Sequence, residues 1–173
     1  DKKVVRVARW VGAVRSFEAV RDIFERYHVN VAVVDVAPEM RKSQELRDYF
    51  VNKGGTMVYL CRFYPTQRVG TQKYGLKLDY QSQVVTVDRT AVFDATFDDL
   101  VEGTRVFPED VFTVLGWADQ MRSPTRVLDE GRGRIVWENT GPDHYRLSDI
   151  YDRVALDLLD LGGSYGVIEG KGQ

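Results

Sequence analysis

The sequence has very little cysteine or histidine. Its 173 residues include one cysteine, Cys61, and two histidines, His28 and His144. A single cysteine cannot form an internal disulfide, and Cys61 lies in TMVYLCRFY, an apolar stretch that is typical of a strand. We therefore expect a buried, unreactive thiol rather than a disulfide or a cysteine nucleophile.

Common nucleotide-binding and hydrolase motifs are missing as well. The chain contains no G-x-x-x-x-G-K-[ST], no G-x-G-x-x-G and no H-E-x-x-H. Their absence argues against a P-loop, dinucleotide binding and zinc-protease chemistry.

Long apolar runs are absent too. None approaches the roughly 20 residues that a membrane-spanning helix needs, and the start DKKVVRVARW lacks the order of a signal peptide. We therefore expect an intracellular protein that is not secreted and does not enter a membrane. A hydrophobic content of 43% suits one domain over residues 1–173, and the net charge of -2 argues against a uniformly basic surface.

Hydrophobic periodicity predicts strands and helices that alternate along the first half of the chain. We expect a strand over 2–12, a helix after the N-cap Ser16, a strand that ends at Asp35, a helix over about 38–51 and a strand over 54–64. The inward residues of the two helices are expected to be Phe17, Val20, Phe24 and Tyr27, and Leu46, Tyr49 and Phe50. This order predicts an α/β domain whose sheet is at least partly parallel.

The second half is less regular. Residues 65–83 read as a long surface loop, with a short irregular strand as the alternative. A strand over 84–90, a helix over 91–103, a helix over 109–122 and a hairpin turning at Gly131 and Gly133 follow. In the first of these helices Phe93, Phe97, Leu100 and Val101 are expected to face inward. The last helix begins near Pro142, and the glycine-rich tail from Gly162 is expected to be flexible.

Two aspartates stand where a ligand site is expected. Asp35 ends a buried strand, and open α/β sheets bind ligands beyond the carboxyl ends of such strands. In the last helix Leu147, Tyr151, Val154 and Leu158 define the packed face, and Asp143 lies only about 40° from Leu147. The alternative is that Asp35 caps the next helix and that the dipole at the start of the last helix stabilises the charge of Asp143.

Other polar residues of the last helix have simpler explanations. Asp149 lies about 160° from Leu147, so we expect Asp149 and Asp152 on a solvated face with partners such as Arg153. His144 could orient a water or a phosphate, although a histidine at a helix start is more often a surface or capping residue.

A converging pair of carboxylates would need a cation between them. Like charges repel, and oxygen ligands without a cysteine cluster suit Mg²⁺ or Mn²⁺. Two such ions can activate water and stabilise the leaving oxygen of a phosphodiester, so the pair Asp35 and Asp143 predicts a nuclease.

Three segments resemble the C-terminal nuclease domain of bacteriophage terminase large subunits, the DNA-packaging proteins. They are VRSFEAVRDIFERYHVNVAVVDVAPE, VTVDRTAVFDATFDDLVEGTRVFPED and TGPDHYRLSDIYDRVALDLL. The resemblance implies an RNase H-like (RuvC-type) α/β fold with a mixed central sheet flanked by helices on both faces. It also implies an endodeoxyribonuclease that uses two Mg²⁺ or Mn²⁺ ions to cleave concatemeric double-stranded viral DNA during genome packaging in the host cytoplasm.

The resemblance assigns roles to individual positions. Asp35 matches the family's second acid and Asp143 the last, with Asp149 as a fallback; Glu39 and His144 are further candidates. The family carries its first acid on an earlier strand, and no such strand precedes Lys2, while Asp1 is a poor substitute. We therefore expect either a fragment or a chain that has lost its first ligand.

The resemblance also implies partners: double-stranded DNA, the terminase ATPase domain, the small terminase subunit and the portal protein. Contact with DNA phosphates needs positively charged side chains, and we expect these in the long surface loop and in the hairpin turn. The alternative is that these side chains form an ordinary solvated surface. The candidate DNA-binding residues are Arg62, Arg68, Lys73, Lys77, Arg132 and Arg134. Arg89 could instead pair with a nearby acid and be structural.

Two other functions remain open at this point. The first is a non-catalytic RNase H-like module that binds DNA or docks on the packaging motor, which the missing first acid favours. The second is another RNase H-like nuclease, such as a resolvase, which would prefer branched over linear duplex.

Overall fold

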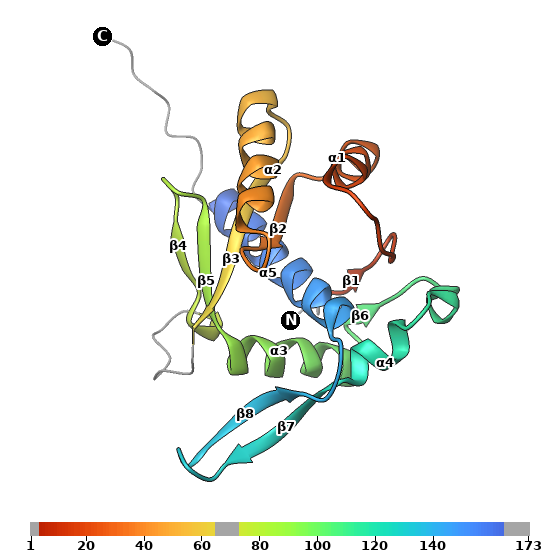
Figure 1. Cartoon of the computed structure of the whole chain (residues 1–173), viewed down its shortest axis with the longest axis vertical. Helices are drawn as coiled ribbons and strands as arrows, with labels where there is room; N and C mark the ends of the chain where they lie inside the picture. Colours follow the sequence, from red (N-terminus) through yellow and green to blue (C-terminus); the bar gives the residue numbers. More distant parts are fainter. Residues whose placement is uncertain (1–3, 65–72, 165–173) are drawn as a thin grey trace.

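The computed structural model describes residues 4–64 and 73–164 (Figure 1). The helices are α1 (Phe17–Arg26), α2 (Met40–Lys53), α3 (Arg89–Val101), α4 (Trp117–Arg122) and α5 (His144–Ser164), with 3-10 turns η1 (Lys73–Gly75) and η2 (Val111–Thr113). The strands are β1 (Arg6–Val7), β2 (Val31–Asp35), β3 (Met57–Tyr64), β4 (Lys77–Asp79), β5 (Val84–Asp88), β6 (Arg105–Val106), β7 (Pro124–Asp129) and β8 (Arg134–Asn139).

The central sheet is mixed and has the strand order β2-β3-β5-β4. β2, β3 and β5 run parallel, and β4 joins β5 antiparallel. Among the described residues no strand pairs with the outer edge of β2, beside which lies a cavity of about 490 Å³ between residues 7–12, α1, β2 and α5. The expected α/β class with a partly parallel sheet is therefore confirmed.

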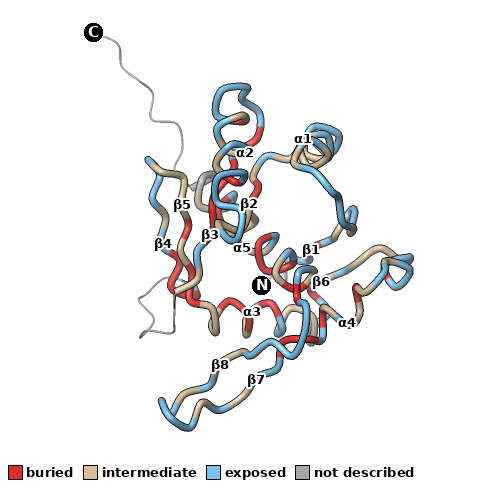
Figure 2. The backbone as a smooth tube through the Cα atoms, in the orientation of Figure 1, coloured by how far each residue is buried: buried red, intermediate tan, exposed pale blue. Residues whose placement is uncertain are grey.

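Helices cover both faces of the sheet, because its strands alternate their side chains between the two faces (Figure 1). Val58 of β3 packs with Leu46 and Phe50 of α2 on one face. Tyr59 and Cys61, its neighbours along the strand, pack against α5 on the other. The most deeply buried segments accordingly lie on β3, β5, α3 and α5 (Figure 2).

Local signals at two helix starts agree with the structure. The Ser16 hydroxyl accepts a hydrogen bond from the Ala19 N–H (3.2 Å), as expected for the N-cap of α1. The Asp88 carboxylate accepts one from the Ala91 N–H (2.9 Å) at the start of α3. Asp88 is fully buried at the end of β5, so it fixes where the sheet ends and α3 begins.

Two small sheets lie outside the central one. β1 and β6 form a parallel pair, and β7 and β8 form the expected hairpin, with Gly133 at φ 60° in its turn. The hairpin is held to α3 because the indole N–H of Trp137 donates to Asp94 (2.8 Å). It otherwise extends away from the body of the molecule (Figure 1).

Some expectations were wrong in detail. The strand expected over 2–12 is limited to Arg6–Val7 among the described residues, because its partner β6 has only two residues. The helix expected over 109–122 is broken by Gly116, whose φ of 75° separates η2 from α4. Residues 65–72 lie outside the described residues, and 73–83 contain η1 and β4, which agrees with the short-strand alternative.

Several side chains expected inward are exposed, namely Tyr27, Phe97 and Val101. Phe97 packs on Trp137 of the hairpin and stays partly accessible at that junction. The tail expected from Gly162 lies largely outside the described residues, although α5 continues to Ser164. Within the described ranges, none of the helices has the length and apolar character needed to cross a membrane.

Candidate functional site

Asp35 lies at the carboxyl end of β2 and faces α5. Its cross-strand neighbour Cys61 belongs to the core on the α5 side of the sheet, and the two side chains share that face. The Oδ1 atom of Asp35 accepts the Ala37 N–H (2.9 Å), and the Oδ2 atom accepts the hydroxyl of Tyr151 on α5 (2.7 Å). The orientation of the carboxylate is therefore fixed from both sides.

Tyr151 is buried and holds its proton firmly. Burial raises the pKa of its hydroxyl, and the hydrogen bond to Asp35 raises it further. Its ring stacks on Phe63 of β3, with 5.9 Å between ring centres. Burial, followed by the nearby charge of Asp35, also raises the pKa of Cys61 to about 12, in agreement with the unreactive thiol that we expected.

Asp143 is buried immediately before α5, as its helical position predicted. Its Oδ2 atom lies 4.0 Å from the guanidinium of Arg89 and accepts no hydrogen bond from any described residue. Arg89 also donates to the side-chain oxygen of Asn139 (3.1 Å) and lies over the ring of Phe93, 4.5 Å from its centre. Arg89 thus pairs with a nearby acid, as one of our two readings expected.

The two carboxylates lie on the same face of the sheet without touching within the described chain. Asp143 precedes Tyr151 by eight residues, which is about 12 Å along a helix axis. Arg89 lies 5.4 Å from the ring centre of Phe63, and Phe63 stacks on Tyr151. A row of contacts therefore runs from Asp35 through Tyr151, Phe63 and Arg89 to Asp143.

No group of three His, Cys, Asp or Glu side chains that could hold a metal ion occurs in residues 4–64 and 73–164. A cation at this face would therefore be held by Asp35 or by Asp143 with water or substrate oxygens completing its shell.

The solvated position expected for Asp149 is wrong. Asp149 is 3% exposed, and its carboxylate lies 2.6 Å from Arg105 and 3.6 Å from Arg6. Asp152 keeps an exposed side chain, but its partners are Arg6 and Arg105 (3.1 and 3.0 Å) rather than Arg153. The β1–β6 pair supplies both arginines, so these acids anchor that pair to α5.

Two further candidates, His144 and Glu39, do not belong to the row of contacts between Asp35 and Asp143. His144 is exposed, and Glu39 is exposed at the start of α2, where its side chain makes no capping hydrogen bond. Glu39 remains a candidate through the resemblance, and His144 through its position beside Asp143.

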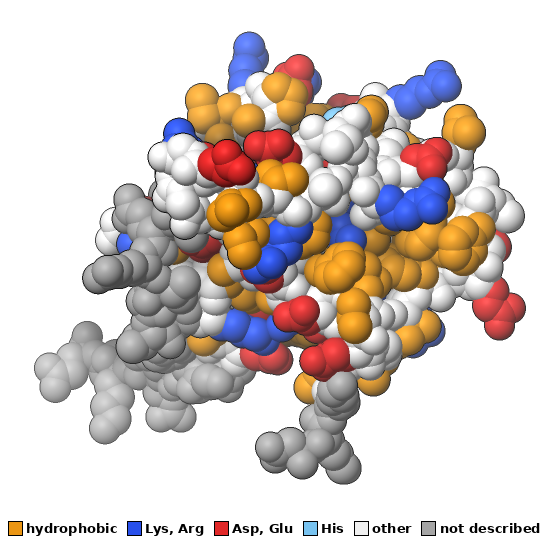
Figure 3. Space-filling view, turned by 90° about the horizontal axis from the view of Figure 1, so that it is seen from below, with side chains coloured by type: hydrophobic (Ala, Val, Ile, Leu, Met, Phe, Trp, Pro, Cys, Tyr) orange, Lys and Arg blue, Asp and Glu red, His pale blue; other side chains and the backbone are white. Residues whose placement is uncertain are grey.

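The candidate DNA-binding cations divide into separate groups. Arg62 and Lys77 lie on the α2 face of the sheet, whereas Lys73 pairs with Asp157 of α5 (3.1 Å). Arg132 is exposed in the hairpin turn, 3.7 Å from Asp129, and Arg134 is half-buried. Arg68 lies outside the described residues. Seen from below, positive and negative side chains are mixed among hydrophobic ones (Figure 3).

Sequence reasoning missed the role of Tyr151. It was assigned to packing, which is correct for its ring, but the hydrogen bond of its hydroxyl joins residues 116 positions apart. The signal that could have found it is a tyrosine on an otherwise aliphatic helix face, because a buried phenol needs a hydrogen-bond partner.

Comparison of the chain with protein-family models, with curated proteins and with solved structures finds no match.

Proposed function

We propose that the chain is an RNase H-like nuclease domain of the terminase type, which cleaves double-stranded DNA with divalent cations. The observation that carries the proposal is that Asp35, bonded to Tyr151 of α5, and Asp143, immediately before α5, lie on one side of the sheet near the carboxyl ends of its parallel strands. Ligands of open α/β sheets bind at such strand ends. The resemblance of the three segments assigns the same two positions as catalytic acids.

The donor atoms suit a hard cation. Carboxylate oxygens are the ligands that Mg²⁺ and Mn²⁺ prefer, and Oδ2 of Asp143 is a buried oxygen to which no described residue donates a hydrogen bond. Such ions, when bound, supply an activated water and stabilise the leaving oxygen of a phosphodiester.

The neighbouring side chains position these acids. Tyr151 donates to Asp35 and leaves the second lone pair of Oδ2 available as a ligand. Arg89 lies next to Asp143 and can donate to a phosphate oxygen of the substrate, since a guanidinium matches phosphate geometry. The resemblance also implies a third acid on a further strand, and the unpaired outer edge of β2 is a place where such a strand could join the sheet.

The test is nicking of supercoiled plasmid with Mn²⁺. Asp35→Asn and Asp143→Asn should each lower the nicking rate by at least a hundredfold, since each removes a charged ligand. Asp119→Asn is the matched control, because Asp119 forms an exposed pair with Arg122 on α4 and should change nothing. Equal nicking by the wild-type chain and by both site variants would refute the proposal.

A second candidate is a non-catalytic module that binds DNA. It is favoured by the partners that both carboxylates already have: Arg89 lies beside Asp143, and Tyr151 donates to Asp35. In that case the chain would bind linear duplex with the same affinity in Mn²⁺ and in EDTA, and would leave the plasmid intact. Metal-dependent nicking that Asp35→Asn abolishes would exclude it.

A further inference from the structure

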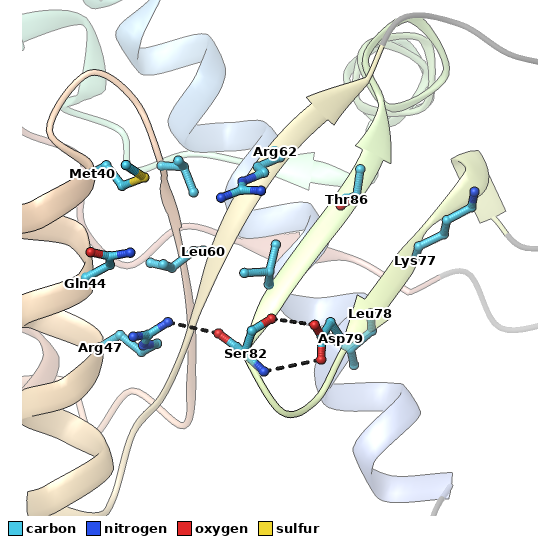
Figure 4. Close-up of a pocket in the computed structure, with 12 residues that line it drawn as sticks. Met40, Gln44, Arg47, Leu60, Arg62, Lys77, Leu78, Asp79, Ser82 and Thr86 are labelled. Atoms are coloured by element: carbon cyan, nitrogen blue, oxygen red, sulfur yellow. Dashed lines mark hydrogen bonds between the residues drawn. The ribbon is translucent and has the colours of Figure 1, made fainter.

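A polar cavity lies on the opposite face of the sheet from Asp35. α2 covers β2 and the start of β3 on this face, and beyond α2 a cavity of about 460 Å³ opens over β3, β5 and β4 (Figure 4). A cavity of this size falls within the roughly 300–1,000 Å³ of small-ligand sites.

The strand register places two cations in one row across this cavity. Arg62 of β3 is opposite Thr86 of β5, and Thr86 is opposite Lys77 of β4. Neighbouring strands lie about 4.8 Å apart, so the backbone positions of Arg62 and Lys77 are about 10 Å apart with the Thr86 hydroxyl between them. Figure 4 shows the Lys77 amine pointing away from Arg62, so both side chains would turn toward Thr86 to contact one anion above that hydroxyl.

Within the described residues, no acid forms an ion pair with the cations of this cross-strand row, Arg62 and Lys77. Arg62 and Lys77 form no ion pair there, although cross-strand neighbours often pair opposite charges. The ammonium of Lys77 lies 5.7 Å from the centre of the Tyr64 ring, which orients it without removing its charge. Two uncompensated positive charges therefore lie beside one cavity.

The acid that lines the cavity, Asp79, already accepts hydrogen bonds within a turn. Asp79 accepts the N–H groups of Gln81 and Ser82 (3.0 and 3.2 Å) and the Ser82 hydroxyl (2.7 Å). The hydrogen bonds from Ser82 lower the pKa of Asp79 and stabilise its charged form in that turn. Arg47, the third cation of the lining, is engaged by Asp48 and by the Ser82 carbonyl.

The remaining lining adds neutral donors and an apolar floor. Gln44 reaches the cavity from α2, and Figure 4 shows Arg62 between Gln44 and Thr86. Leu60 and Val84 form the next cross-strand row and supply apolar surface beside the charges. Cations, a hydroxyl and an amide over an apolar floor are the groups that hold a phosphate next to a base or sugar.

We propose that this cavity binds the phosphate of a nucleotide unit through Arg62, Lys77 and Thr86. The unit is either part of a DNA strand or a free nucleotide, and both present the same anion. The site lies on the other face of the sheet from Asp35, so it does not rest on the cleavage reaction.

The proposal is tested by isothermal titration in EDTA and about 0.15 M salt, where exposed charges are screened beyond roughly 8 Å. The probes are deoxyadenosine 5′-monophosphate, deoxyadenosine and a short single-stranded oligonucleotide. We expect the monophosphate to bind at least tenfold more tightly than the nucleoside. Tighter binding of the oligonucleotide than of the monophosphate assigns the site to a DNA strand, and the reverse order assigns it to a free nucleotide.

The variants identify the site. Arg62→Ala and Lys77→Ala should each weaken binding of the monophosphate at least fivefold, Thr86→Val two- to threefold, and Arg62→Lys less than Arg62→Ala. Arg41→Ala is the charge-matched control, since Arg41 is exposed on α2 beside Glu45 and should change binding less than twofold. Asp35→Asn should bind normally, which separates this site from the proposed cleavage.

Two results would overturn the proposal. The first is equal affinity for deoxyadenosine and its monophosphate. The second is an affinity of folded Arg62→Ala and Lys77→Ala, checked by circular dichroism, that equals the affinity of Arg41→Ala.

Discussion

The hydroxyl of Tyr151 donates a 2.7 Å hydrogen bond to Oδ2 of Asp35, and this bond joins the middle of α5 to the end of β2. β2 is an edge strand among the described residues, so its carboxyl end is held by β3 on one side and by this contact with α5. The bond therefore serves both the stability of the sheet edge and the orientation of the candidate metal ligand.

Removal of that hydroxyl should affect stability and activity together. Tyr151→Phe keeps the ring stacked on Phe63 but loses a hydrogen bond to a charged group, which costs about 1–2 kcal/mol. We expect urea unfolding to show that loss and Mn²⁺-dependent nicking to fall about three- to tenfold, because the Asp35 carboxylate can then rotate. Tyr80→Phe, at an exposed position, is the control. Unchanged nicking by Tyr151→Phe would remove the positioning role.

The buried ion cluster around Asp149 should be essential for folding. Asp149→Asn keeps the side-chain shape but removes the buried carboxylate beside Arg6 and Arg105, whose side chains are both 5% exposed. These arginines then keep only the partly buried Asp99 and the exposed Asp152 as described acidic partners. Breaking such a cluster costs about 3–5 kcal/mol. The free energy of unfolding in urea measures this, and Asp119→Asn should differ from wild type by less than about 0.5 kcal/mol. A loss below about 1 kcal/mol in Asp149→Asn would contradict the structural role.

Local patterns predicted the central part of the fold well. Ser16, Asp35 and the break at 54–55 mark element boundaries through capping and turn chemistry, which depend on neighbouring residues only. Asp143 was placed correctly because helical periodicity relates it to the apolar residues of its own helix.

Asp149 shows why other parts could not be predicted in the same way. The periodicity of α5 places it away from the main apolar face, but a helix can be buried on a second side by another element. That element is the β1–β6 pair, whose arginines come from positions 6 and 105. The pairing of Arg62 with Thr86, and of Thr86 with Lys77, likewise depends on strand register, which a single sequence does not specify.

Asp99 of α3, which pairs with Arg6 of the cluster around Asp149 (2.8 Å), should make stability depend on pH. Burial alone would raise the pKa of Asp99, but the hydrogen bond and charge of Arg153, followed by those of Arg6, outweigh it and lower this pKa. An acid whose folded pKa is lowered contributes stability above its unfolded value of about 3.9, and that contribution is lost as the pH falls through the folded pKa. We therefore expect the unfolding free energy to decline below about pH 4 and to decline less in Asp99→Asn.

Urea unfolding measured from about pH 3 to pH 6 tests the role of Asp99. An acid dependence in Asp99→Asn as steep as that of wild type would show that Asp99 does not carry the effect.

Arg89 should compete with a metal ion for Asp143. Its guanidinium lies 4.0 Å from Oδ2, so a cation that approaches this oxygen meets a positive charge already beside it. If Asp143 is a metal ligand, Arg89→Ala should tighten Mn²⁺ binding about five- to tenfold, as measured by the free Mn²⁺ signal in electron paramagnetic resonance. Arg89→Lys keeps the charge and should bind Mn²⁺ like wild type, and adding Asp143→Asn to Arg89→Ala should abolish the gain. Equal Mn²⁺ affinity of the alanine and lysine variants would place the metal away from Asp143 and leave the non-catalytic module as the better account of this face.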